Sequence, residues 1–462
     1  MTRGWHRWIS VLLVCMLVLM PGISCAQEES AWDVLYAEGE AMYARMSALT
    51  AEEATFEFQG ETYALREGLD YANKNLFGTA DYDLYCTALM EAMIARSNRI
   101  GEAFLEEIRK LNETAVSLGY EHYLDYQWQS YGLDGDPGDV LRMFMAQYPK
   151  TFGFILENNW LSEEDLESAL DDQTLLEIAA QAYGQIDPGY ETAIRDLIGS
   201  DAFLCREQRE GASDGYTTDY NASCDPPVTV MVSGSGTCRF LITSAHEFGH
   251  YLHEIATQGR DEGIFFEVLE THSIAGTILC EAAIEEVLAR ELGEAYGAYC
   301  TLQYMDALLG SLVDMTVVYL TVEDMYLHPE AHQGEDFAKS YLDLYLAAGV
   351  DGGYSEAYQM MLGSDWWYVS DGIFAYPGYL PTYAKATHNA IWLWYQQAQG
   401  ADAAQLYREL ISTAVPDIGG EAFLREMGFP DPMDPQTYAE LDDFVYDKLV
   451  SLYVEAFGEE PY

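Results

Sequence analysis

The sequence predicts a mainly α-helical fold with a small β-sheet beside one central helix and a deep groove for a ligand. Long segments carry apolar residues at helical spacing, whereas convincing strand material is confined to a stretch between about Cys205 and Gly236. The chain has 462 residues, of which 49% are hydrophobic, so it is not globally disordered and can bury a large core.

The predicted helices are five segments that run longer than strands do. They are residues 31–49, 84–118, 162–183, 273–292 and 438–457. Clusters of glycine and proline interrupt the helical pattern and predict turns between helices. These clusters are residues 132–138, 349–353, 416–420 and 428–432.

Residues 1–26 have the pattern of a secretory signal peptide. A short basic stretch is followed by an apolar run from Trp8 to Met20 and by small residues that end at Ala26. The run is too short for a comfortable membrane span, and no later apolar run is expected to cross a bilayer. Cleavage after Ala26 would release the protein, whereas cleavage before Cys25 would leave a cysteine for a lipid anchor. We therefore expect an exported protein, extracellular or associated with the cell envelope.

Six cysteines remain outside this segment, and an oxidising destination permits disulfides. Cys205, Cys224 and Cys238 lie in a loop-rich stretch, so we expect a bridge among them. Cys280 and Cys300 are expected to be small buried hydrophobic residues on helices.

The strong negative charge excludes one class of partner. The formal net charge is −55 and the isoelectric point is near 4.1. A surface with this charge repels a phosphate backbone, so nucleic-acid binding is excluded.

One motif indicates the chemistry. His246, Glu247 and His250 form the pattern HExxH within residues 240–253, whose apolar residues recur at helical spacing. Residues four apart lie on the same helix face, so both histidines can bind one Zn²⁺ ion. Glu247 would then lie beside the metal, where it can take a proton from a water that the ion has acidified and pass it to a leaving amine. The motif predicts a zinc hydrolase.

A catalytic zinc site needs a third protein ligand and an open position for water. A glutamate in this role lies roughly 20 to 30 residues downstream on a second helix, a window that contains both Glu267 and Glu270. We assign Glu270, which begins a Glu-x-x-Ser pattern. His272 is the rival ligand, but it points to a different helix face and cannot serve the same ion. Glu267 would support the site from outside or be solvated.

These residues resemble the active-site signature of the thimet oligopeptidase and oligoendopeptidase F family. In that family HExGHxxH is followed by a Glu-x-x-Ser helix, and residues 245–253 and 270–273 match both patterns. Residues 226–234 resemble the strand that precedes the zinc helix and lies along the bound peptide, and residues 118–126 are similar to a helix-turn signature. The resemblance covers most of the chain after residue 100. It implies a helical peptidase fold, one zinc ion and short peptide substrates.

Residues 376–383 resemble the family's tyrosine motif, in which tyrosines four apart donate hydrogen bonds to the substrate carbonyl and the tetrahedral oxyanion. The resemblance assigns these roles to Tyr379 and Tyr383. On physical grounds, phenol hydroxyls aimed at a developing oxyanion stabilise the transition state more than the ground state. The alternative is that both tyrosines are packing residues, since the chain contains 35 tyrosines.

The chain departs from the family pattern at two places. The histidine that usually precedes the first of these tyrosines is replaced by Ile373 or Phe374, so recognition of the substrate carbonyl is expected to differ. A glutamate that often follows the third ligand by seven positions is Thr277 here. Glu281, one turn further along the same face, is the candidate to orient a ligand histidine instead.

We therefore predict an exported zinc metallopeptidase that hydrolyses internal bonds of short oligopeptides. It would comprise the signal peptide, an N-terminal helical region (residues 27–200) and a zinc peptidase catalytic region (residues 201–462), with the site in the groove between the last two. Two alternatives stay open: an exported peptide-binding protein on a degenerate peptidase scaffold, and a carboxypeptidase or dipeptidase. Glu247 favours an enzyme, because a protein that only binds peptides has no use for a general base there.

Overall fold

The computed structural model describes most of the chain from residue 30 to residue 461. The residues it leaves undescribed within that range are 66, 134, 158–169, 207–214, 234–237, 263–264, 335–336, 341–342, 344–372, 375 and 439. The signal peptide and the anchor at Cys25 lie outside the described residues and stay predictions.

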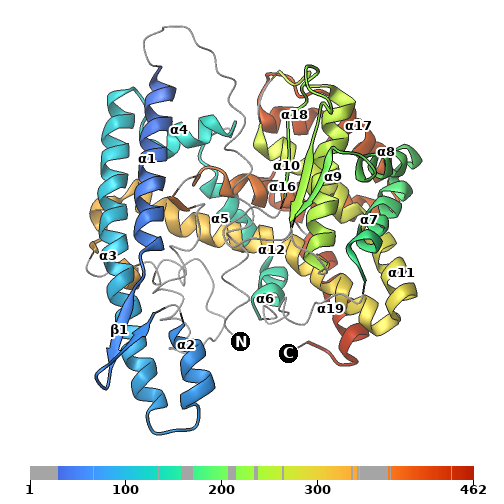
Figure 1. The fold of residues 1–462 in the computed structure, drawn as a ribbon. Coiled ribbons are helices and arrows are strands. Elements are labelled where there is room, and N and C mark those ends of the chain that lie inside the picture. The colour runs from blue at the N-terminus through green and yellow to red at the C-terminus, as the bar shows by residue number, and fades with distance from the viewer. Residues whose placement is uncertain are drawn as a thin grey trace. The chain divides into compact units, whose positions relative to one another are not determined.

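The chain divides into two compact units (Figure 1). The first unit contains residues 128–316 and 378–461, and the second contains residues 30–127 and 317–377. The boundary predicted near residue 200 lies inside the first unit, because helix α7 (Asp172–Ile186) packs against helix α9 (Cys238–Thr257). The predicted groove stays a prediction.

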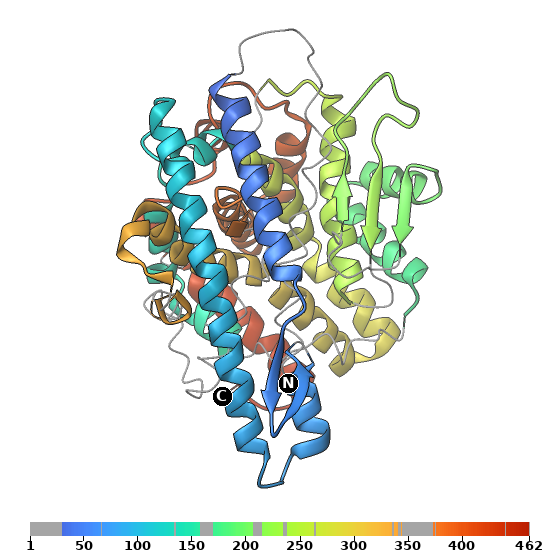
Figure 2. The ribbon, with the colours of Figure 1, turned by 60° about the vertical axis from the view of Figure 1, so that its left-hand side comes forward.

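In the second unit, two long helices lie side by side, as Figures 1 and 2 show: α1 (Ala31–Ala51) and α3 (Tyr82–Ser117). Ser30 caps α1 with its hydroxyl, which accepts a hydrogen bond from the backbone N–H of Asp33, and Asp33 caps the Ser30 N–H in return. The smaller elements of this unit are α2 (Gly68–Tyr71), the π-helix η2 (Ala72–Leu76) and the short helix η4 (Pro329–Ala331). Helix α4 (Tyr123–Ser130) and helix α12 (Glu294–Leu327) contribute residues to both units.

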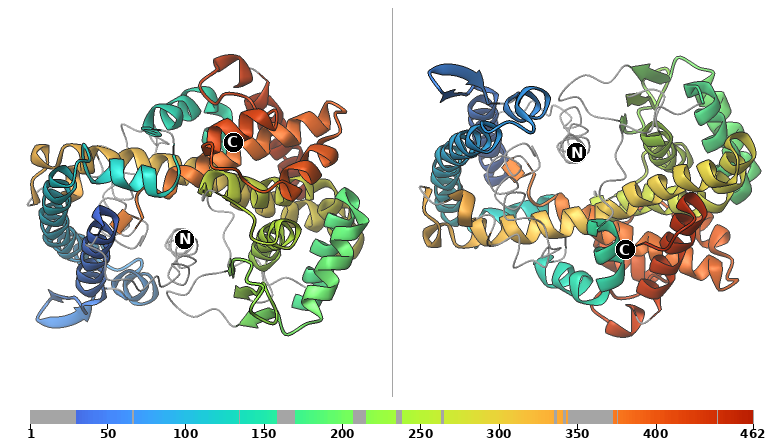
Figure 3. Two further views of the ribbon diagram at one scale, coloured as in Figure 1. Left: turned by 90° about the horizontal axis from the view of Figure 1, so that it is seen from above. Right: turned by 90° about the horizontal axis from the view of Figure 1, so that it is seen from below.

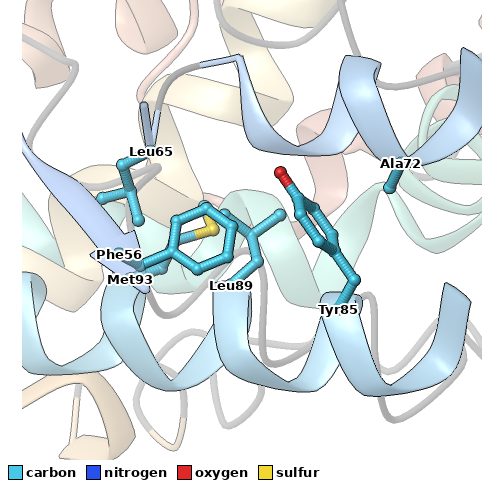
Figure 4. Packing of buried hydrophobic residues seen from close by; sticks show 6 residues of the cluster. All are labelled: Phe56, Leu65, Ala72, Tyr85, Leu89 and Met93. Atoms are coloured by element: carbon cyan, nitrogen blue, oxygen red, sulfur yellow. The ribbon is translucent and has the colours of Figure 1, made fainter. Parts of the chain in front are cut away.

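A β-hairpin in this unit was not predicted. Strands β1 (Thr55–Phe58) and β2 (Glu61–Ala64) pair antiparallel across Gln59 and Gly60, which have φ of 51° and 86°. Two positive φ values are typical of a type I′ turn. The hairpin packs on α3 through the cluster in Figure 4, which consists of Phe56, Leu65, Ala72, Tyr85, Leu89 and Met93.

The first unit contains a three-stranded sheet next to α9, as Figure 2 shows. Its strands are β3 (Phe203–Arg206), β4 (Gly215–Thr217) and β5 (Val230–Ser233), in the region where strands were predicted. The central strand β5 pairs parallel with β3 and antiparallel with β4. Both edges of β5 are therefore occupied, and the prediction that this strand lies along the bound peptide is wrong.

The remaining elements of this unit are helical, and Figure 3 shows α7 and α8 side by side near α9. These elements are α5 (Gly138–Gln147), α6 (Pro149–Glu157), α8 (Pro188–Ile198), α10 (Phe266–Leu279), α11 (Glu281–Leu292), α16 (Leu380–Ala398), α17 (Ala403–Ser412), α18 (Gly420–Glu426), η7 (Pro435–Tyr438) and α19 (Leu441–Phe457). The mainly helical fold with a small sheet is confirmed, but the helix predicted over residues 273–292 is two helices that meet at Cys280.

Two further expectations need correction. Helix α12 is long and apolar enough to cross a membrane, because its most apolar stretch has a mean hydropathy of 1.5. However, 78% of that stretch is buried, as in the core helix of a globular protein.

The expected bridge among the loop cysteines is the second expectation. Cys205 and Cys224 are free thiols, so no bridge joins these two, and the side chain of Cys238 lies outside the described residues. Cys280 and Cys300 are buried, as predicted.

Candidate metal centre

Helix α9 presents both histidines of the HExxH motif on one face. Its apolar side chains Leu241, Ala245 and Phe248 are buried where the helix packs against α7, α10 and β5. The Nε2 atoms of His246 and His250 are 3.2 Å apart, and the two side chains keep 14% and 19% exposure. The predicted helix and the convergence of its histidines are therefore present.

Glu270 on α10 completes this group. Its Oε2 atom lies 3.3 Å from Nε2 of His246 and 3.7 Å from Nε2 of His250, and the ligand atoms of all three residues lie within 4.8 Å of one another. Burial opposes ionisation of Glu270, yet the two histidines hold the pKa of its carboxyl below the usual value. Two imidazole nitrogens and a carboxylate oxygen are a donor set that suits Zn²⁺.

The Oε2 atom of Glu270 tests whether these residues fit a metal. This oxygen is buried and accepts no hydrogen bond from any residue that the structure describes. Burial of an ionised carboxylate oxygen without a partner is costly. A cation held between this oxygen and the two imidazole nitrogens would remove that cost, so the residues present fit the metal.

The glycine and serine of the motifs bring α9 and α10 together. A Cβ atom on Gly249 would lie 2.6 Å from the Cα atom of Ser273, so only glycine permits the observed approach of the two helices. The Ser273 hydroxyl donates a hydrogen bond of 2.5 Å to the carbonyl oxygen of His246. The Tyr183 hydroxyl on α7 donates a hydrogen bond of 2.8 Å to the carbonyl oxygen of the preceding residue, Ala245. These contacts fix the ligand helix against its neighbours.

Glu247 lies beside the metal ligands and is held by β4. Its carboxylate is buried, and its Oε2 atom accepts a hydrogen bond of 2.7 Å from the Thr217 hydroxyl. A Cβ atom on Gly215 would lie 2.7 Å from Oε1, so the strand passes close to this carboxylate. Burial raises the pKa of Glu247, which favours its acceptance of a proton. The sequence did not indicate the role of Gly215 or Thr217.

The rival ligands face other partners. The Glu267 carboxylate lies 2.6 Å from Nζ of Lys385, in a buried ion pair. The His272 ring is fully buried, 4.0 Å from the ring of His253 between centroids, and the pKa of His272 is far below its usual value because of burial. His253 in turn lies 2.9 Å from the Asp261 carboxylate, so it joins α9 to the residues that follow this helix.

Tyr379 and Tyr383 both reach the metal group, but with different partners. The Tyr379 hydroxyl donates a hydrogen bond of 2.8 Å to Oε1 of Glu270. The Tyr383 ring stacks on that of His246, with centroids 6.1 Å apart and planes inclined by 14°. The two hydroxyl oxygens are 3.3 Å apart. Both side chains are buried and come from the start of α16, which packs along α10.

The departures from the family pattern are visible in the structure. Ile373 and Phe374 are both buried apolar side chains. The Thr277 hydroxyl donates to the carbonyl of Ser273 within its own helix. Glu281 lies 3.7 Å from Nζ of Lys448 and forms no ion pair with either ligand histidine among the described residues, so its proposed role in orienting a ligand is wrong.

No model of a known protein family matches the chain, and no curated protein matches it in sequence. Solved structures do match its fold. A structure of PZ peptidase A with inhibitor 2 superposes with a TM-score of 0.63 and 14% identity over 91% of this chain and 77% of that chain. Oligoendopeptidase F from Enterococcus faecium superposes with a TM-score of 0.57 and 14% identity over 93% and 73%. The chain therefore has the fold of the oligoendopeptidase F and PZ peptidase structures, as its motifs predicted.

Proposed function

We propose that the protein is a zinc metallopeptidase of the oligoendopeptidase F family, which hydrolyses internal bonds of short peptides. One observation carries the proposal: the buried Oε2 atom of Glu270, without a hydrogen-bond donor among the described residues, faces the Nε2 atoms of His246 and His250 beside the carboxylate of Glu247. The structural neighbours named as peptidases support this reading.

His246, His250 and Glu270 would hold the ion. Zn²⁺ bound there would supply a Lewis acid that polarises the scissile carbonyl and lowers the pKa of a water molecule. Glu247 accepts a proton from the attacking water and delivers it to the leaving amine. Thr217 keeps the Glu247 carboxylate in place through its hydrogen bond. The Tyr383 hydroxyl, on a ring stacked against His246, is the donor we assign to the oxyanion.

The substrate would be an extended peptide that pairs with β4. This strand uses one edge for β5, and no other described strand pairs with its second edge. Thr217 donates a hydrogen bond to Glu247, and a Cβ atom on Gly215 would meet the same carboxylate, so a peptide added along β4 would pass the general base. This assignment replaces the central strand β5 that the sequence suggested.

We also propose that the protein is exported, on the strength of the signal pattern in residues 1–26. Cleavage after Ala26 and lipid attachment at Cys25 would give proteins of different mass and solubility. Mass spectrometry of the N-terminal peptide from cells that express the chain distinguishes the two.

The test compares the zinc-loaded wild type with Glu247→Gln and His246→Ala on a library of short peptides, read by mass spectrometry, with zinc content measured in parallel. Glu247→Gln should keep one zinc ion and lose turnover, because it keeps the ligands and removes the base. His246→Ala should lose both. A chelator should abolish wild-type cleavage, and added Zn²⁺ should restore it.

The products separate the alternatives. Internal cleavage by the wild type supports an endopeptidase, whereas release of terminal residues alone would favour a carboxypeptidase or dipeptidase. Peptide and zinc binding without cleavage by any variant would support the peptide-binding protein. Full turnover by Glu247→Gln would exclude the assigned general base.

A further inference from the structure

We propose that Tyr379 is a positioning residue for the metal ligand Glu270 rather than a second donor to the substrate. Its hydroxyl would hold one oxygen of the carboxylate so that the other oxygen alone faces the ion. This inference rests on the proposed metal site and assigns a new role to a residue within it.

The two oxygens of Glu270 have different surroundings. Oε1 accepts the hydrogen bond of 2.8 Å from Tyr379, whereas Oε2 lies 3.3 Å and 3.7 Å from the ligand histidines. The terminal torsion of a glutamate has a broad energy profile, so nothing intrinsic to the side chain prevents rotation or binding through both oxygens. A donor fixed on Oε1 removes that freedom. Ligand carboxylates are commonly held in this way, and loss of the outer partner weakens the metal.

Packing fixes the direction of the Tyr379 hydroxyl. Tyr379 precedes the first residue of α16, and its side chain is 4% exposed. Its ring contacts those of Tyr131, Phe266 and Tyr383, with centroids 5.5, 5.7 and 5.1 Å away. Phe266 is the first residue of α10, the helix that carries Glu270. Tyr379 therefore contacts the helix that carries Glu270 at two points, through its ring against Phe266 and through its hydrogen bond to the ligand carboxylate.

Tyr383 provides a matched control. It lies one turn further along α16 and is equally buried, at 5% exposure, but its ring stacks on His246. Replacement of either tyrosine by phenylalanine removes one hydroxyl at nearly the same depth. The Tyr379 hydroxyl donates directly to the ligand carboxylate, whereas the Tyr383 hydroxyl lies 3.3 Å from that of Tyr379, so the two substitutions should affect metal binding differently.

The experiment measures the Zn²⁺ dissociation constant of wild type, Tyr379→Phe and Tyr383→Phe by competition with a chromophoric chelator. We expect Tyr379→Phe to weaken Zn²⁺ binding by about 10–100-fold, the usual effect of losing such a partner, and Tyr383→Phe to leave the affinity within about threefold of wild type. The absorption spectrum of the Co²⁺-loaded protein should change in Tyr379→Phe, because the carboxylate is freed, and stay unchanged in Tyr383→Phe.

Unfolding of the metal-free proteins shows whether either substitution damages the fold. If Tyr379→Phe did, a ring-fluorinated tyrosine at position 379 would keep the shape and alter the acidity of the hydroxyl, and the inference then requires a changed Zn²⁺ affinity. Wild-type affinity in Tyr379→Phe, or in the fluorinated protein, would overturn the inference. So would a loss of kcat in Tyr379→Phe with unchanged metal affinity, because it would return this tyrosine to the substrate. Failure of the wild type to bind Zn²⁺ would instead overturn the proposed function itself.

Discussion

Lys385 is the centre of a buried ion cluster, and its removal should destabilise the first unit. The side chain is 2% exposed, and its Nζ atom lies 2.6 Å from Oε2 of Glu267 and 2.7 Å from Oε1 of Glu421. Burial alone would lower the pKa of Lys385, but the two carboxylates raise it above the usual value. The cluster joins α10, α16 and α18, and Asn389 adds a hydrogen bond of 3.4 Å to Glu267.

The structure sets the size of the effect for Lys385→Met. The substitution leaves Glu267, with a side chain 6% exposed, without its counter-ion, and loss of one partner of a buried pair costs roughly 3–5 kcal/mol. Glu421 is 21% exposed and can regain water, so we expect the lower end, about 3 kcal/mol. Because burial already raises the pKa of Glu267, protonation should relieve part of this cost as the pH falls.

Urea unfolding of wild type, Lys385→Met and the double variant Lys385→Met/Glu267→Met provides the assay. The double variant should regain most of the lost free energy of unfolding, because removal of both buried charges is often neutral or stabilising. A cost below about 1 kcal/mol for the single variant, or a double variant no more stable than the single one, would refute the reasoning.

Two further predictions concern helix packing and pH. Gly249→Ala should lower the free energy of unfolding by about 1–3 kcal/mol and weaken zinc binding, because its Cβ would meet the Ser273 backbone. Gly153→Ala is the control, since its Cβ would meet nothing within 4 Å. In the same calorimetric scan this alanine should be neutral or slightly stabilising. Equal effects of the two alanines would contradict this. Burial raises the pKa of Glu281 from 4.5 to about 7, although nearby Lys448 opposes the shift. The folded protein therefore binds a proton at Glu281 more tightly than the unfolded chain does. As the pH rises from about 4.5 to about 7, wild-type stability should fall. Glu281→Gln should lose this fall in stability between pH 4.5 and 7. A difference in unfolding midpoint between variant and wild type that stays constant over this range would show that Glu281 does not cause the fall.

The zinc helix could be predicted from the sequence because its chemistry is local. Two ligands and a base lie within one turn, and an apolar helical repeat surrounds them, so the motif and its secondary structure agree. The choice of the third ligand was less direct. Glu267 and Glu270 are three apart on one helix, and their difference lies in their partners, Lys385 and Tyr379, which come from more than a hundred residues downstream.

The elements that were missed depend on weaker local signals. The hairpin of β1 and β2 has alternating Phe56 and Phe58, but its turn uses Gln59, a residue that seldom adopts positive φ, in place of asparagine or aspartate. The break between α10 and α11 falls at Cys280 without glycine or proline. The assignment of the peptide strand failed because pairing on both sides of a strand is a property of the assembled sheet.

Helix α10 explains why the site could not be completed from one stretch of sequence. Nearly all of its residues are buried, so it has no apolar stripe that would tell which face meets the metal. Three of its polar side chains have partners on α16 or at its N-cap: Glu267 pairs with Lys385, Glu270 with Tyr379, and Thr271 with Asn389, which donates at 3.2 Å. Without α16, two carboxylates would be buried without these partners, which is costly. Docking of α16 therefore stabilises the ligand helix, because the same segment supplies the Tyr379 hydroxyl that orients the third ligand and the Lys385 ammonium that neutralises the charge beside it.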